Sequence, residues 1–274
     1  MKKKEAGIGM VLYLLLFASL ARGGINPDLI DIPTARVLEK YQIQTTFRFY
    51  RQEGLLLKAK VGLTDRFTIG ASYGGIGVVG DGEISWNPRP GFSLRYLISQ
   101  ESQNLPFSLT LGYEAQGYGL YYQKGDEVQV NSDLYLVRDK YEFYRTNSKG
   151  FFLVMGKEIP RGIYVLGGIN HSLDAAPLKK PVSFFLGVEE QFTTRLVGKL
   201  EYNNIFHNEV KHADFLEGYE GEEPFRKSGG ELNLGISWYF SPSVSLEFDI
   251  RDVTRRFFPF SGNRTFRINY FGKF

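Results

Sequence analysis

The sequence predicts an all-β chain, a transmembrane antiparallel up-and-down β-barrel of about twelve strands. Three observations lead to this prediction. Apolar and polar residues alternate along almost the whole chain, short and long connections alternate between the strands, and the last strand ends on an aromatic residue, Phe274. Alternation fits a barrel wall because successive side chains of a strand point to opposite faces.

The chain begins with the features of a secretory signal peptide over residues 1–21. Lys2–Lys4 are basic, Ile8–Phe17 form an apolar run, and Ser19 and Ala21 occupy the small-residue positions of a cleavage site. The apolar run is too short to span a bilayer as a mature helix. The chain has no cysteine, which excludes a disulfide-stapled secreted domain and a lipoprotein anchor. We therefore expect export, with residues 22–40 forming a periplasmic or lumenal segment and 41–274 the barrel.

Period-two alternation then recurs in segment after segment. In residues 92–98, for example, Phe92, Leu94 and Tyr96 alternate with serine and arginine. The expected strands are residues 41–50, 55–63, 67–74, 92–99, 107–114, 148–157, 162–171, 182–189, 196–203, 232–238, 244–251 and 265–274. Alternation alone does not say which face is inward, so a soluble β-sandwich or barrel with an apolar interior remains the alternative.

The connections favour the membrane interpretation. Those near residues 64–65, 159–161, 192–194 and 241–243 are tight turns, whereas 75–90, 116–147, 172–180, 204–229 and 252–263 are mostly longer. Outer-membrane barrels have short periplasmic turns and long outer loops. An even strand count then puts both termini in the periplasm. The connection at 100–106 is longer than the other turns, and the one at Arg51–Gly54 is shorter than the other loops.

The final strand carries the expected assembly signal. Phe266, Ile268, Tyr270 and Phe274 share one face of it, which is the pattern of the terminal strand that barrel-assembly machinery reads. We expect outer-membrane lipid and that machinery to be partners of the chain. The net charge of +3 gives no indication of a nucleic-acid partner.

Charged residues on the polar face are the candidates for the lumen lining. They are Arg48, Lys58, Lys60, Arg95, Glu114, Glu189, Lys199, Glu201, Glu247, Asp249, Arg251 and Arg267. Their signs nearly cancel, whereas a pore for strongly charged solutes would have a lining of one sign. We expect these side chains to pair across strands and to fill the interior, with inward glycines such as Gly187 and Gly235 relieving the crowding.

No enzyme, cofactor or metal site is expected. Gly70–Gly74 matches the G-x-S-x-G pattern, but the five residues continue a strand rather than the strand-to-helix turn that a nucleophile elbow needs. His207 and His212 lie in the acidic stretch 204–229, where a loop cation site is weighed against a solvated acidic loop. The solvated loop is the preferred interpretation.

Residues 24–97 resemble a known family. The segment Leu29-Ile30-Asp31-Ile32-Pro33-Thr34-Ala35-Arg36 is similar to a Leu-Ile-x-x-Pro-Thr-Ala-Arg segment in exopolysaccharide-associated outer-membrane barrels, and the blocks 55–67 and 86–92 resemble the same group. The resemblance implies a pore or export-linked component for polysaccharide or small solutes. The alternative is a non-conducting structural or adhesive barrel that acts through its outer loops.

Overall fold

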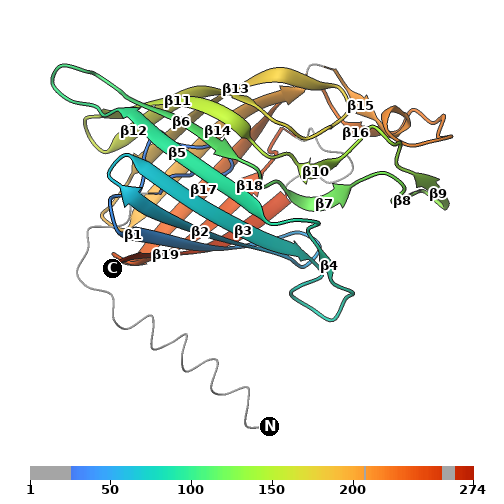
Figure 1. Cartoon of the computed structure of the whole chain (residues 1–274), viewed down its shortest axis with the longest axis horizontal. Coiled ribbons are helices and arrows are strands. Elements are labelled where there is room, and N and C mark those ends of the chain that lie inside the picture. Colours follow the sequence, from blue (N-terminus) through green and yellow to red (C-terminus); the bar gives the residue numbers. More distant parts are fainter. Residues whose placement is uncertain (1–25, 207, 255–262) are drawn as a thin grey trace, which may run out of the picture.

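The computed structural model describes residues 26–206, 208–254 and 263–274, and within them a closed antiparallel barrel of 12 strands confirms the predicted fold (Figure 1). The predicted signal peptide lies outside these residues. Neighbouring strands pair in order, and the β2–β3 pairing closes the ring. The barrel strands are β1 (Gln42–Tyr50), β2 (Gly54–Thr64), β3 (Phe67–Ile76), β5 (Gly91–Ser99), β6 (Ser108–Glu114), β11 (Gly150–Ile159), β12 (Ile163–His171), β13 (Lys179–Gln191), β14 (Leu196–Phe206), β17 (Gly229–Ser241), β18 (Val244–Arg251) and β19 (Asn263–Lys273).

The two ends of the barrel differ. At the turn end, strands are joined by residues 65–66, 100–107, 160–162, 192–195 and 242–243. At the loop end, the connections 77–90, 115–149 and 207–228 are much longer and reach beyond the barrel in Figure 1. Short and long connections therefore alternate around most of the barrel, as the sequence indicates. Each long connection links two neighbouring antiparallel strands, which a hairpin turn could also have joined.

The loop end has secondary structure that the sequence analysis does not predict. It contains β4 (Ser85–Trp86), β7 (Tyr118–Tyr122), β8 (Glu127–Val130), β9 (Asp133–Leu136), β10 (Phe143–Thr146), β15 (Val210–Lys211), the short 3-10 helix η1 (His212–Asp214) and β16 (Pro224–Arg226). These strands pair as β7–β10, β8–β9 and β15–β16. In the described part of the chain, no helix is long and apolar enough to cross a membrane.

The barrel has the reverse polarity of a soluble protein. On β5, Phe92 is 62% exposed, whereas its near neighbour Arg95 is 1% exposed. The same contrast recurs on the other strands, with exposed leucine, isoleucine, valine and aromatic side chains outside and buried charged and amide side chains inside. The soluble alternative requires an apolar interior, so this distribution contradicts it.

Aromatic pairs lie on the exposed face near both ends of the strands. Tyr73 stacks on Trp86 with ring centroids 5.7 Å apart, and Trp238 meets Phe240 at 5.8 Å. At the turn end, Phe274 is 70% exposed and its ring lies 5.5 Å from that of Tyr41. Such rings suit the two interfaces of a bilayer. The assembly role of the terminal strand stays a prediction.

Leu234 offers a test of the outward face. It is 42% exposed in the middle of β17. We expect Leu234→Arg to lower the free energy of unfolding in lipid vesicles by about 2–4 kcal/mol, because arginine would then face hydrocarbon. Leu134→Arg is the control, since Leu134 is also exposed but lies on β9, outside the barrel wall. Equal losses for the two variants would show that this face does not contact lipid.

Candidate functional site: the lumen and its plug

The structure places the twelve candidate lumen residues on the inner side of the barrel. Arg48, Lys60, Arg95, Glu114, Lys199, Glu201, Glu247, Asp249, Arg251 and Arg267 are all buried. The side chains of Lys58 and Glu189 are 12% and 15% exposed. A lumen this crowded with charge requires a partner for each group, because an unpaired buried charge is costly.

Some of these charges pair across strands as the sequence analysis expects. Lys199 lies 2.8 Å from Glu247, Arg267 lies 3.1 Å from Asp249, and Lys58 pairs with Glu114. These contacts join β14, β18 and β19 on one side of the barrel and β2 with β6 on the other. Strand-to-strand pairs are not the only ones in the interior, because several cations have partners in the N-terminal segment.

The N-terminal segment supplies those partners from inside the lumen. Residues 26–38, here called the plug, include Leu29, Ile30, Ile32, Ala35 and Leu38, each 0% exposed. The plug turns back on itself: the Leu29 N–H donates to the Ile32 carbonyl at 2.9 Å and the Thr34 N–H to the Pro27 carbonyl at 2.8 Å. Pro33 has no N–H donor, so its place in this turn leaves no donor unsatisfied.

Close approach to the barrel wall depends on inward glycines. A Cβ atom at Gly187 would lie 2.5 Å from the Leu29 side chain, and one at Gly235 would lie 3.0 Å from that of Ile30. Leu29 and Ile32 also pack against a buried apolar cluster that includes Phe152 and Phe185. The glycines relieve crowding, as expected, and what they make room for is the plug.

Asp31 lies at the inner tip of the plug. Its carboxylate pairs with Arg48 at 2.6 Å and with Arg251, and accepts a hydrogen bond from the Tyr118 hydroxyl at 2.8 Å. Burial would raise the pKa of Asp31, but the guanidinium groups of Arg251 and Arg48 hold that pKa well below its ordinary value. Asp31 therefore links β1, β18 and the loop end.

Asp28 makes the corresponding contacts with β2 and β5. Its carboxylate pairs with Lys60 at 2.5 Å and with Arg95. Arg95 also donates to the Pro27 carbonyl. These bonds attach the plug to β2 and β5.

Backbone groups of the tip are satisfied by the wall as well. The Glu201 carboxylate accepts hydrogen bonds from the N–H groups of Ile30, Asp31 and Ile32 at 3.0, 2.9 and 3.2 Å. Lys199 and Arg267 both donate to the Leu29 carbonyl at 3.1 Å, and Arg48 donates to that of Ile30 at 2.6 Å. A buried backbone needs such partners, so the wall and the tip are complementary.

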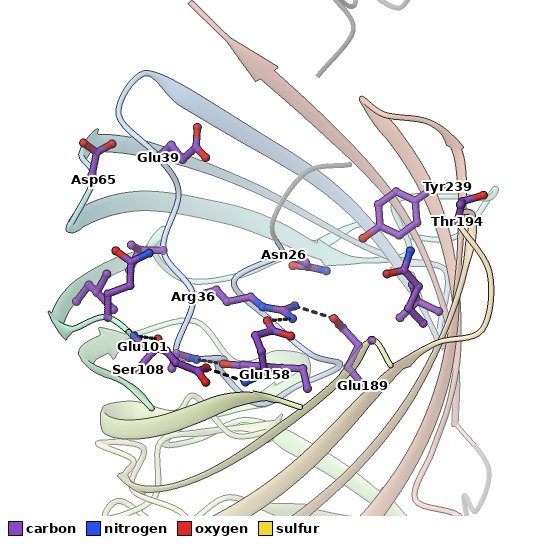
Figure 2. A pocket seen from close by; sticks show the side chains of 18 residues that line it. Asn26, Arg36, Glu39, Asp65, Glu101, Ser108, Glu158, Glu189, Thr194 and Tyr239 are labelled. Atoms are coloured by element: carbon purple, nitrogen blue, oxygen red, sulfur yellow. Dashed lines mark hydrogen bonds and ion pairs between the residues drawn. The ribbon is translucent and has the colours of Figure 1, made fainter. Parts of the chain in front are cut away.

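Arg36 fastens the plug at the turn end (Figure 2). Its guanidinium pairs with Glu158 and Glu189, both at 2.7 Å, and lies 3.9 Å from the centre of the Tyr164 ring. Burial would lower the pKa of Arg36, but Glu189 and Glu158 raise it above the ordinary value. One arginine of the plug thus bridges β11 and β13.

The plug fills the middle of the lumen. An open cavity of about 900 Å³ lies at the turn end. Figure 2 shows side chains that line it, among them Asn26, Arg36, Glu39, Asp65, Glu101, Ser108, Glu158, Glu189, Thr194 and Tyr239. Beyond the tip, a void of only about 20 Å³ lies beside Asp31, Arg48 and Tyr118. A void of this size has room for about one water molecule.

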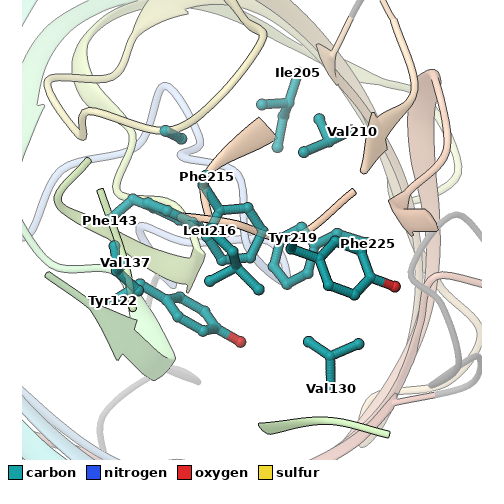
Figure 3. Close-up of a cluster of buried hydrophobic side chains, with 11 residues drawn as sticks. Tyr122, Val130, Val137, Phe143, Ile205, Val210, Phe215, Leu216, Tyr219 and Phe225 are labelled. Carbon is teal, nitrogen blue, oxygen red and sulfur yellow. The ribbon is translucent and has the colours of Figure 1, made fainter. Parts of the chain in front are cut away.

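A folded cap covers the loop end. Tyr122, Phe143, Phe215 and Phe225 form the centre of an apolar cluster, with ring centroids 5.0 Å apart for Tyr122–Phe143 and for Phe215–Phe225 (Figure 3). His212 lies against this cluster, 5.6 Å from the Phe225 ring. Across the described ranges no three acidic, histidine or cysteine residues are grouped to hold a metal, and His207 lies outside those ranges.

The G-x-S-x-G match lies inside a strand. Ser72 belongs to β3, which runs straight from Phe67 to Ile76. Its hydroxyl lies 3.4 Å from the Gly91 carbonyl and 3.4 Å from the Gln116 side-chain oxygen. The local geometry is that of a strand and not of a nucleophile elbow.

Sequence reasoning missed the residues that hold the plug in the lumen: Asp28, Asp31, Arg36 and Tyr118. The available signal was weak, namely two acids three positions apart in an otherwise apolar stretch. Their partners are far away in sequence: Arg251, for example, lies 220 positions after Asp31.

Comparisons with known proteins give likenesses of fold. No protein-family model matches the chain, and no curated protein sequence matches it. Among solved structures, the chain is similar to the KdgM porin (9% identity, 85% of this chain and 99% of that chain, TM-score 0.46) and the NanC porin (9%, 85% and 99%, 0.42). It is also similar to the Acinetobacter baumannii outer membrane protein Omp33 (8%, 86% and 98%, 0.40). Likenesses this distant say nothing about a solute.

Removing the Asp31 carboxylate should loosen the plug. Asp31→Ala leaves Arg48 and Arg251 without that partner, and breaking a buried ion pair costs about 3–5 kcal/mol. We expect faster cleavage of residues 26–40 by added protease in detergent micelles, with the barrel still folded. Glu39→Ala is the control, because Glu39 is exposed and its pair with Lys273 contributes about 0–1 kcal/mol. Cleavage of Asp31→Ala at the control rate would contradict the anchoring role.

Proposed function

We propose that the chain is an integral outer-membrane β-barrel that forms a pore for small solutes or an extended saccharide chain, and that the plug holds this pore closed. The observation that carries the proposal is the plug itself, a length of backbone lying inside a polar lumen. The turn end would face the periplasm, as short turns do in outer-membrane barrels.

The outer face supports placement in a membrane. Large apolar side chains are exposed on β5, β13, β14, β17 and β18, including Leu186, which is 54% exposed, and Ile236, which is 43% exposed. A soluble monomer rarely exposes a continuous apolar surface of this extent. A closed ring of strands satisfies its backbone internally, which lipid requires.

The width of the lumen supports passage of a chain. The wall encloses a folded-back stretch of polypeptide, with both limbs of the turn at Leu29–Ile32 side by side. A lumen that holds two strands of backbone has room for one extended saccharide chain. Its wall offers amide, carboxylate, guanidinium and ammonium groups, which are hydrogen-bonding partners for sugar hydroxyls.

The path of the plug supports reversible closure. Asn26 and Arg36 both line the turn-end cavity (Figure 2). The tip with Asp31 lies farther in, beside Tyr118 and Thr146 of the loop end. The plug enters and leaves at the same end, so it can withdraw without threading through the barrel. The residues of the exopolysaccharide-family resemblance, Leu29–Arg36, lie within the plug.

A non-conducting surface barrel is the second candidate. The folded cap favours it, because Tyr122, Phe215 and Phe225 give the loop end an apolar core of its own. An adhesive barrel needs such a rigid outer surface and has no need of a withdrawable plug. Conductance separates the two candidates.

Conductance in a planar lipid bilayer tests the proposal. We expect the full chain to be closed most of the time, Arg36→Ala to open more often, and a variant lacking residues 26–38 to conduct steadily. Arg36→Ala removes both ion pairs at the turn end. Arg89→Ala is the control, because Arg89 pairs with Glu142 at the exposed loop end.

Each variant should first show the heat-modifiable gel mobility of a folded barrel. A folded plug-deleted barrel that carries no current would refute the pore and leave the surface barrel. A full chain that conducts as much as the deletion would refute closure by the plug.

A further inference from the structure

Oxygen atoms of the plug contact an unusually basic part of the lumen wall. Six basic side chains donate to them: Arg48, Lys60, Arg95, Lys199, Arg251 and Arg267. Near the tip, among the described residues, the wall carboxylate that binds the plug is Glu201, which accepts from backbone N–H groups. At the turn end, Glu158 and Glu189 pair with Arg36 of the plug. The wall around the plug is therefore arranged to hold oxygen acceptors.

Several of these cations depend on the plug for their charge partner. Within the described part of the chain, Arg48 and Lys60 form ion pairs with the plug carboxylates alone, Arg48 with Asp31 and Lys60 with Asp28. The other pairs of Arg95 and Arg251 are longer, 3.4 Å to Glu114 and 3.5 Å to Glu231. Withdrawal of the plug would leave buried positive charge that is costly without a new partner.

We propose that the path occupied by the plug is a binding track for an anionic, oxygen-rich extended chain, such as a saccharide chain that bears carboxylates. The inference rests on the proposed pore and names its substrate class. The Asp28 carboxylate occupies the position where one acid group of the solute would bind Lys60 and Arg95. The Asp31 carboxylate occupies the position where another would bind Arg48 and Arg251. The carbonyls of Leu29 and Ile30 stand where its hydroxyl and ring oxygens bind.

The track is local to the plug. The charged residues that line the turn-end cavity are Arg36 and five acids, Glu39, Asp65, Glu101, Glu158 and Glu189. Anion attraction therefore belongs to the middle of the lumen rather than to its mouth. Because the basic residues are buried, salt screens them less than it screens the exposed acids of the mouth.

A competition experiment tests the track without any need for conductance. The full chain and its Arg36→Ala variant are held in detergent micelles with carboxymethyl-dextran oligomers, and cleavage of residues 26–40 by protease reports displacement of the plug. Neutral dextran oligomers of equal length are the matched probe. We expect the carboxymethylated oligomers to displace the plug at a concentration about tenfold lower than the neutral oligomers require. A modest additional free energy of binding gives a ratio of this size.

A wall variant shows where the probe acts. Arg48→Gln with Arg251→Gln removes two cations of the track, and the preference for the carboxymethylated probe should fall to less than a third of its original value. Arg138→Gln is the control, because Arg138 donates to the Leu216 and Ala213 carbonyls in the loop-end cap. Unchanged preference in the wall variant would overturn the track.

Bilayer recordings separate failure of the track from failure of the pore. In a potassium chloride gradient, we expect the open channels of the Arg36→Ala variant to have a reversal potential that indicates a preference for anions. Channels that open but prefer cations, with equal displacement by the two dextrans, would overturn the anionic track and leave the pore. Selective displacement without any opening would support the track and refute the pore.

Discussion

Inverted polarity is the constraint on which the rest of the structure depends. With apolar side chains outside, the interior of the barrel holds the charged and amide groups, and each of them needs a partner. Pairs such as Arg267–Asp249 satisfy some of these groups across neighbouring strands. The remaining cations need oxygen acceptors that the wall does not supply, and the plug supplies them.

The plug therefore has two roles that are hard to separate. Asp31 joins Arg48 of β1 to Arg251 of β18, and Asp28 joins Lys60 of β2 to Arg95 of β5. These bonds stabilise the barrel by connecting strands that do not pair with each other directly. In the proposed pore the same bonds hold the plug in the lumen, so opening requires the charges to find another partner. A closed state with this much electrostatic complementarity opens readily only when a competing anion or a pull on the plug compensates for the loss.

The sequence predicts the wall well and the plug poorly, for a physical reason. Strand alternation is a local signal, and β5 with its exposed Phe92 and buried Arg95 can be predicted from a few adjacent residues. The plug is held by contacts at long sequence separation, from Asp31 to Arg251 and from Ile30 to Glu201. Pro33 disfavours a central strand in this segment, but it does not indicate which groups the segment contacts. The small strands of the loop end are not predicted because segments of two to five residues are too short to show a clear two-residue alternation.

Thiol labelling tests the central claim, that the plug lies inside the lumen, most directly. The chain has no cysteine, so single substitutions give a clean signal with a water-soluble maleimide. Ile30 is 0% exposed at the tip, whereas Glu39 is exposed at the turn end. With the plug in place, Ile30→Cys in the folded protein reacts far more slowly than Glu39→Cys. The two variants react at the same rate once the protein is unfolded. Equal rates in the folded protein would place residues 26–38 outside the barrel and contradict the account.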